Sequence, residues 1–294
     1  MGDFFDSYLS DNVIKKEEDK MKKIITLLLT ALLVLTLAGC GAKEEAKDEK
    51  VIKVACTAVP HAVILEKAKE ILAKDGWDLQ ITIFNDYVQP IEVVESGEMD
   101  ANYFAHVPYL DNYNAENKTS QVAVCKVHSE PLGIYTGKKA SISELAAGDE
   151  IAVPNDGTNE TRALLLLEAN GILELPAGTT VDSIVTVNDI VSYKIDGVKI
   201  VEMEAANIPH VIDDLALAAL NGNYAMEAKI TDRGIAFEAA DSDLMVTYVN
   251  VLSCKEANKD AANIKALADV LRSNEIKSFI QSEYNGTVIF YEGK

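Results

Sequence analysis

Arg162 lies in the first turn of a predicted helix, where its charge suggests a binding site for an anion. The stretch 151–171, IAVPNDGTNETRALLLLEANG, is typical of a short apolar strand, a polar turn and a helix that Gly171 can end. A helix start has unpaired N–H groups and a partial positive charge, so a cation there needs an anion close by. Backbone N–H groups and a guanidinium suit a carboxylate. The alternative is an ordinary capped helix whose arginine pairs with Glu160 or with solvent.

Three other predicted strands are also followed by side chains that suit a ligand. The sequence NDY (85–87) follows one strand, NYFAHVPY (102–109) overlaps and follows a second, and NGNY (221–224) follows a third. Carboxyl ends of parallel strands meet at one edge of a sheet, where ligands bind in a crevice. We therefore expect these side chains and Arg162 to lie together.

This set of side chains suits a small zwitterion with an apolar side chain. Arg162 would take the carboxylate, amide oxygens the ammonium group, and aromatic rings the apolar part. A thioether is especially compatible, because sulfur packs well against rings. Two alternatives stay open: the aromatic residues could be plain core, and the asparagines on either side of Gly222 could serve only its turn.

Motifs of catalysis and metal binding are absent from the sequence. It has no GxSxG, HExxH or GxxxxGK[ST] motif, and none of its four histidines (His61, His106, His128 and His210) has a metal-ligand partner at i+3 or i+4. Acidic pairs such as Asp213-Asp214 are expected by chance in so acidic a chain. The sequence therefore predicts no enzyme, no catalytic residue, no cofactor and no metal.

Composition and charge favour a globular protein with a small ligand. The chain has 294 residues, 48% of them apolar, and a formal net charge of −20. Such a charge argues against binding nucleic acid and against adsorption to a membrane by basic residues.

The N-terminal region is predicted to be a targeting segment. Lys22 and Lys23 precede an apolar run that ends in Leu-Ala-Gly-Cys at residues 37–40, which is a lipobox. We expect a lipoprotein signal peptide at 21–39, a diacylglycerol on Cys40, and a charged tether at 40–50. Residues 1–20 would then precede the true start. The prediction is a lipid-anchored protein on the extracytoplasmic face of the cell membrane.

Three further cysteines, Cys56, Cys125 and Cys254, lie in strand-like apolar runs without CxxC or Cys/His spacing. Buried free thiols are the favoured interpretation, with one disulfide as the alternative.

The order of predicted elements indicates an α/β protein with two lobes. Residues 51–57, 62–74 and 78–84 form a strand–helix–strand unit, which favours a parallel sheet. Two long extended runs, 121–135 and 244–254, could cross between lobes. We expect lobe 1 to comprise 51–134 and 245–294, and lobe 2 to comprise 135–244.

Several segments together resemble the NlpA/MetQ-type lipoproteins, the substrate-binding subunits of methionine ABC importers. The most specific are MDANYFAHVPYLDNYN (99–114) and ISELAAGDEIAVPNDGTNETRALLLLEANGIL (142–173), and VPHAVILEKAKEIL (59–72), DYVQP (86–90), PLGIYTGK (131–138), IVEMEAANIPHVIDD (200–214) and LNGNYA (220–225) agree with them. The resemblance covers essentially all of 51–294.

The resemblance implies a two-lobed type II periplasmic-binding-protein fold with L-methionine in the cleft between the lobes. It implies ligand-binding residues on both sides, namely Tyr87, Phe104, His106 and Tyr109 from lobe 1 and Asn159, Arg162, Asn207, Asn221 and Asn223 from lobe 2. It also implies an ABC importer permease with its ATPase as partner, and we expect a monomer.

Departures from the usual family sequence lie near this expected pocket, at Ile91, Ala105, Asn207 and His210. They leave D-methionine, a methionine-containing dipeptide or another small apolar amino acid as alternative ligands. An enzyme or adhesin using the same cleft is the alternative from another class.

Overall fold

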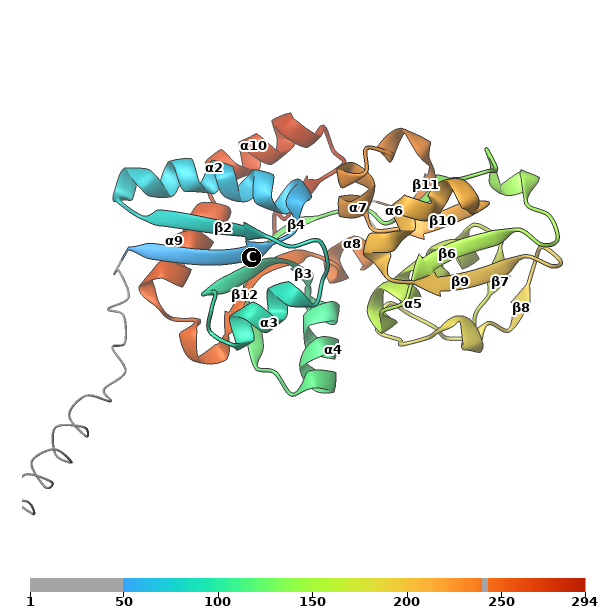
Figure 1. Ribbon diagram of the computed structural model, residues 1–294, viewed down its shortest axis with the longest axis horizontal. Helices are drawn as coiled ribbons and strands as arrows, with labels where there is room; N and C mark the ends of the chain where they lie inside the picture. The colour runs from blue at the N-terminus through green and yellow to red at the C-terminus, as the bar shows by residue number, and fades with distance from the viewer. Residues whose placement is uncertain (1–49, 240–242, 294) are drawn as a thin grey trace, which may run out of the picture. The chain divides into compact units, whose positions relative to one another are not determined.

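The computed structural model describes residues 50–239 and 243–293, and residues 50–294 form one compact unit. The predicted signal peptide, Cys40 and most of the tether lie outside the described residues. Two sheets, A and B, form the centres of two lobes (Figure 1). In the described part of the chain, no helix combines the length and apolar character needed to cross a membrane.

Sheet A has six strands in the order β13-β4-β12-β3-β1-β2. Strand β1 pairs in parallel with β2 and β3, as the strand–helix–strand pattern predicts, while β12 pairs antiparallel with β3 and β4. The strands are β1 (Val51–Cys56), β2 (Asp78–Ile83), β3 (Ala101–His106), β4 (Gln121–Ser129), β12 (Asn250–Lys255) and β13 (Ile289–Phe290).

Sheet B has five strands in the order β11-β5-β10-β6-β9. Strand β6 is parallel to both β10 and β9, and β5 is antiparallel to β10 and β11. The strands are β5 (Gly133–Thr136), β6 (Glu150–Pro154), β9 (Lys199–Met203), β10 (Leu217–Leu220) and β11 (Gly234–Phe237); a separate pair joins β7 (Leu173–Glu174) and β8 (Ser192–Tyr193). The sequence analysis missed β7, β8, β11 and β13, which are too short or too exposed for a clear pattern.

Helices cover both faces of each sheet because successive strand residues point to opposite faces. In sheet A, Tyr103 packs in the core under α2 (Val63–Leu72), α9 (Ala262–Leu271) and α10 (Asn274–Tyr284), while Phe104 packs with α3 (Gln89–Glu95) and α4 (Val107–Asn117). In sheet B, Ile151 packs with α5 (Gly157–Ala169), whereas Ala152 packs in the core that contains residues of α6 (Ile208–Val211) and α7 (Gly222–Glu227).

The chain passes between the sheets twice. The run 121–135 divides as predicted into β4 in sheet A and β5 in sheet B, with residues 130–132 between them. The second run was predicted as one strand over 244–254, which is wrong at its start: Asp243–Thr247 is helix α8, and β12 begins only at Asn250. An apolar run of this length fits a buried helix as well as a strand, so the pattern could not separate them.

Strand membership places the lobe boundaries slightly differently from the sequence. Strand β5 begins at Gly133, two residues before the predicted start of lobe 2. We propose that the boundaries lie in the two crossings, at residues 130–132 and between β11 and β12.

The three cysteines of the described region are free thiols, as favoured by the sequence, and Cys56 and Cys254 are buried. Burial raises the pKa of each thiol, to about 12 for Cys56 and Cys125 and about 11 for Cys254, so all three stay protonated at neutral pH.

Gly137 closes the end of β5 against the approach to β10 and offers a test of this packing. A Cβ atom there would lie 2.2 Å from the backbone oxygen of Leu215 and 2.4 Å from that of Ile212. Both oxygens belong to the backbone and cannot shift without distorting the chain. Gly137→Ala should therefore lower the free energy of unfolding, measured by urea denaturation, by about 1–3 kcal/mol. Gly157→Ala is the matched control, since its Cβ would meet only a methyl group of Ile184 at 3.3 Å. Equal stability of the two variants would contradict this packing.

Candidate functional site

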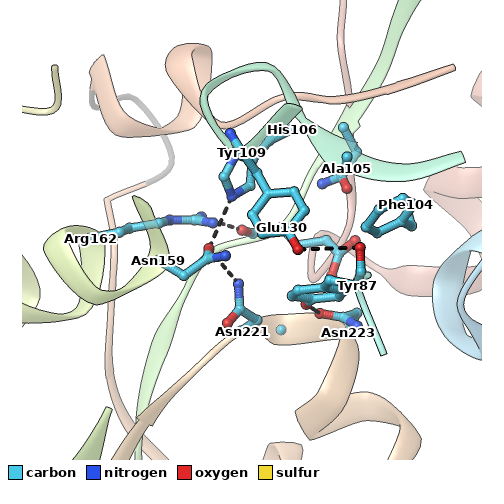
Figure 2. Close-up of a pocket in the computed structure, with 12 residues that line it drawn as sticks. Tyr87, Phe104, Ala105, His106, Tyr109, Glu130, Asn159, Arg162, Asn221 and Asn223 are labelled. Carbon is cyan, nitrogen blue, oxygen red and sulfur yellow. Dashed lines mark hydrogen bonds between the residues drawn. The ribbon is translucent and has the colours of Figure 1, made fainter. Parts of the chain in front are cut away.

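A pocket lies where the carboxyl ends of β3, β6 and β10 meet, with walls from both lobes (Figure 2). Its side chains leave a cavity of about 20 Å³, little more than a water molecule needs. Its lining residues are Tyr87, Phe104, Ala105, His106, Tyr109, Glu130, Asn159, Arg162, Asn221, Gly222, Asn223 and Asn250.

Eight of the nine binding residues predicted from the sequence line this pocket, and Asn207 does not. Asn207 is exposed, lines a separate surface cavity with His210, and donates from its amide nitrogen to Glu204 at 3.2 Å. The reason is topological. Asn207 follows β9, the edge strand of sheet B, whereas Asn159 and Asn221 follow the adjacent inner strands β6 and β10.

Arg162 is buried in the pocket wall, but it already has an anionic partner in the chain. Its Nε and Nη2 donate to the two carboxylate oxygens of Glu238 at 2.6 and 2.5 Å. Nη2 also donates to the backbone oxygen of Glu130 at 2.7 Å, and the guanidinium carbon lies 4.5 Å from the centre of the Tyr248 ring. The alternative partners predicted from the sequence, Glu160 and solvent, are both wrong. Arg162 is buried away from solvent, and Glu160 accepts from the Val187 N–H instead.

The ion pair with Glu238 raises the pKa of Arg162 despite its burial, so the guanidinium stays charged. Glu238 is itself held by the Leu132 N–H, which donates to it at 2.8 Å. Nη1 is the guanidinium nitrogen for which no partner is found among the described residues, so one edge of Arg162 remains for a ligand.

A chain of hydrogen bonds fixes which way the amide of Asn159 points. Asp156 caps α5 and accepts from the Asn159 backbone N–H at 3.0 Å and from its side-chain nitrogen at 2.9 and 3.0 Å. Since a carboxylate only accepts, the Asn159 oxygen must face the other way. There it accepts from the Asn221 amide at 2.8 Å and from His106 Nε2 at 2.9 Å.

His106 fixes the same orientation from the other lobe. It ends β3 and caps α4, where its Nδ1 accepts from the Tyr109 N–H at 3.1 Å. The proton must therefore sit on Nε2, which donates to Asn159. Burial and the nearby Arg162 lower the pKa of His106 to about 3, so the ring is neutral. The polar side-chain atoms of Asn159 and His106 are thus hydrogen-bonded within the protein. These two residues form part of the pocket wall, and their hydrogen-bonding atoms are already paired.

Two buried side-chain atoms in the described part of the chain lack a hydrogen-bond partner, and both belong to pocket residues. They are Oδ1 of Asn221 and Nδ2 of Asn223. Asn221 must turn its nitrogen to Asn159, and Tyr87 donates to Oδ1 of Asn223 at 2.6 Å. The pocket therefore presents one fixed acceptor and one fixed donor, and an unpaired buried polar atom is costly unless a ligand satisfies it.

Aromatic rings form the apolar side of the pocket. The Tyr87 ring lies 5.6 Å from Phe104 and 5.7 Å from Tyr109, between ring centres, and Tyr224 packs on it from lobe 2 at 4.9 Å. These rings also form a small core cluster with Ile91. The core-packing interpretation of the sequence is therefore confirmed for Phe104 and Tyr109. The binding interpretation stays a prediction, which fits the one face of the cluster that borders the pocket.

Four lining residues were missed by the sequence analysis, namely Ala105, Glu130, Gly222 and Asn250. Glu130 directly precedes Pro131 at the first crossing. An acidic residue at the end of an apolar strand was the signal in the sequence that could have indicated it. Gly222 leaves room for it, since a Cβ there would lie 3.3 Å from Cβ of Glu130.

His61, His128 and Glu130 form a buried cluster whose ligand-type atoms lie within 4.8 Å of one another. Its geometry does not fit a metal ion. The Nε2 of His128 lies 2.7 Å from Oε1 of Glu130, a hydrogen-bond distance. Two ligands of a tetrahedral zinc ion with bonds of about 2.1 Å would lie about 3.4 Å apart. We assign no metal to this cluster.

Two α/β lobes joined by two crossings, with an enclosed pocket between them, define the two-lobed periplasmic-binding fold predicted from the sequence. The family model of the NlpA lipoproteins matches residues 52–291, so the chain belongs to the NlpA lipoprotein family.

Known proteins support this assignment. The chain is 38% identical over 261 residues to "D-methionine-binding lipoprotein MetQ" of Escherichia coli O157:H7, covering 87% of this chain and 93% of that protein. It is 51% identical to a putative lipoprotein from Ruminococcus gnavus, with a TM-score of 0.79 over 83% of this chain and all of the other. A nutrient binding protein from Burkholderia cenocepacia, solved bound to methionine, is 36% identical with a TM-score of 0.75, over 81% and 99% of the two chains. These relatives are lipoproteins and binding proteins rather than enzymes.

The Arg162–Glu238 pair predicts a large effect on folding, which the sequence alone did not. Removing one partner of a buried ion pair typically costs about 3–5 kcal/mol, because the other charge is left unpaired. Arg162→Ala should lower the free energy of unfolding without ligand by that amount, measured by urea denaturation.

The double variant Arg162→Met with Glu238→Met is the control. It removes both charges, so it should recover most of the lost stability. A single Arg162→Ala variant as stable as the wild type would show that the ion pair is not formed.

Proposed function

We propose that this protein is a lipid-anchored, extracytoplasmic binding protein that captures L-methionine and delivers it to a membrane ABC importer. The observation that carries the proposal is the pair of unsatisfied buried atoms, Oδ1 of Asn221 and Nδ2 of Asn223, in an otherwise aromatic pocket. They call for a ligand with both a donor and an acceptor. Membership of the family and the names of its relatives suggest the importer, the lipid anchor and methionine as the ligand.

Charged groups extend this requirement to a zwitterion. Nη1 of Arg162 suits a carboxylate, and Oδ1 of Asn221 together with Glu130 suits an ammonium group. The rings of Tyr87, Phe104 and Tyr109 suit an apolar side chain, and a thioether gains further from contact with ring edges. Methionine combines all three features.

D-methionine is the closest alternative, because the Escherichia coli relative is named for it. A methionine-containing dipeptide would need more room than methionine in a pocket this small. One experiment separates these ligands: release the bound molecule from purified protein by denaturation, then identify it by mass spectrometry after chiral chromatography. Recovery of a ligand that is not an amino acid would contradict the proposal.

Asn221 tests the ligand's ammonium group directly. Asn221→Leu keeps the branched shape of the side chain and removes the amide, with both its free acceptor and its donor to Asn159. A hydrogen bond to a charged group is worth about 1.5–3 kcal/mol. We therefore expect calorimetry to show methionine binding at least about tenfold weaker. Asn207→Leu is the matched comparison outside the pocket and should bind within about twofold of the wild type. A loss at Asn207 as large as that at Asn221 would return Asn207 to the site.

The lipid anchor has its own test. If Cys40 is processed as the lipobox predicts, the wild-type protein should fractionate with membranes and begin at a lipid-modified Cys40 in intact-mass measurements. Cys40→Ser should stay unprocessed or appear without lipid. Wild-type protein that retains residues 1–20 and is found in the soluble fraction would contradict the anchor.

A further inference from the structure

Two fully buried histidines stand behind Glu130, and nothing proposed so far uses them. His61 lies in the turn before α2, His128 lies in β4, and each is at most 1% exposed. Nε2 of His128 donates to Oε1 of Glu130 at 2.7 Å, and Nε2 of His61 lies 3.5 Å from the same oxygen. Their far nitrogens meet hydroxyl groups, with Tyr103 on Nδ1 of His128 and Thr57 on Nδ1 of His61 at 2.7 Å.

This arrangement fixes the polarity of the cluster. When Glu130 is ionised its oxygen can only accept, so the His128 proton sits on Nε2 and Nδ1 accepts from the Tyr103 hydroxyl. Nε2 of His61 donates to Oδ1 of Asn250 at 3.1 Å, and Asn250 is itself a pocket residue. Neutral His128 thus donates to one carboxylate oxygen of Glu130, and neutral His61 packs 3.5 Å from the same oxygen, while Glu130 as a whole lines the pocket.

Glu130 is the member of the cluster that titrates near neutral pH. Burial raises its pKa to about 7, although His61, Arg162 and the Asn223 backbone oppose this shift. Burial lowers the pKa of His61 to about 4 and that of His128 to about 3, so both rings stay neutral above pH 5.

Other ionisable groups around Glu130 do not titrate between pH 5 and 8. They are Arg162 of α5, whose pKa is raised by Glu238, and the buried tyrosines, whose pKa values are raised mainly by burial; those facing Glu130 are Tyr87, Tyr103, Tyr135 and Tyr284.

We propose that His61 and His128 are positioning residues that orient the carboxyl group of Glu130 toward the pocket, and that binding of the ligand's ammonium group releases the proton that Glu130 carries in acidic solution. This inference rests on the proposed function. The exchange is balanced: the carboxylic acid O–H of Glu130 loses its proton to solvent, and the ligand ammonium keeps all of its own protons. The cluster thereby makes affinity depend on pH.

The direction of the dependence follows from the raised pKa. Above about pH 7 Glu130 is already ionised and the ligand binds without releasing a proton. Below it the ligand must displace a proton, so affinity should fall toward tenfold for each pH unit, because one proton is exchanged. The fall ends at the lower pKa that Glu130 has beside the bound ammonium.

The experiment is titration calorimetry with L-methionine from pH 5 to 8, in two buffers of different ionisation enthalpy so that released protons are counted. The wild type should release a proton below about pH 7 and lose affinity there. Glu130→Gln should bind more weakly and show no dependence on pH. His128→Leu removes the donor to the carboxylate, so its profile should shift to higher pH by about one unit. His128→Gln, which keeps an N–H donor, should stay nearer the wild type.

Glu160→Gln is the matched control. Burial also raises the pKa of Glu160 to about 7, but its carboxylate accepts from Val187 and the residue does not line the pocket. Its profile should match that of the wild type. If His128→Leu does not fold, His61→Gln and His128→Gln test the positioning role and Glu130→Gln tests the proton release.

Each outcome has a distinct meaning. No binding of methionine at pH 8 would overturn the proposed function, and the inference with it. Binding at pH 8 with a constant affinity down to pH 5 would overturn the inference alone. A pH dependence that survives in Glu130→Gln, or an unshifted profile in a folded His128→Leu, would also overturn it.

Discussion

The buried ion pair between Arg162 and Glu238 ties together the parts of the chain that build the pocket. Arg162 lies in the second turn of α5, not in the first turn as the sequence predicted, and Glu238 begins the second crossing. The Arg162 guanidinium also donates to the backbone oxygen of Glu130 in the first crossing. Glu238 and Leu132 bond each other in both directions, with the Glu238 N–H donating to the Leu132 oxygen at 3.1 Å. Both crossings therefore meet at one charge pair, which desolvation makes costly to break.

Hydrogen-bond polarity spreads from fixed points into the pocket. Asp156 can only accept and the Tyr109 N–H can only donate, and between them they determine the orientation of His106, Asn159 and Asn221. Tyr87 of the opposite lobe donates to Asn223. The acceptor and donor left for a ligand thus follow from hydrogen bonds within the protein. Such fixed polarity gives specificity, because a ligand with the wrong pattern leaves buried atoms unpaired.

The charge of Glu130, on the far side of the pocket, is stabilised in a different way. Glu130 has neutral imidazoles on one side and the pocket on the other, so its charge is supported by hydrogen bonds rather than by a salt bridge. A carboxylate held in this way is poised between its two protonation states. Arg162, by contrast, is locked in its charged state by Glu238. Of the two charged groups of the pocket, Arg162 therefore keeps its charge as the pH changes, whereas Glu130 gains and loses a proton near neutral pH.

The sequence by itself determined the local elements and the edges at which they present polar groups. Periodicity located β1, α2 and β2, capping chemistry located the start of α5, and strand order implied parallel pairing, because all of these depend on near neighbours in the chain. What only the tertiary structure decided involves partners far apart in sequence. Glu238 meets Arg162 across 76 positions, and His61 meets Asn250 across 189. Asn207 lies outside the pocket because it follows β9, and whether β9 is an edge or an inner strand depends on the order of the whole sheet. Side chains at such positions acquire their partners only when the strands and helices of their own lobe have packed together.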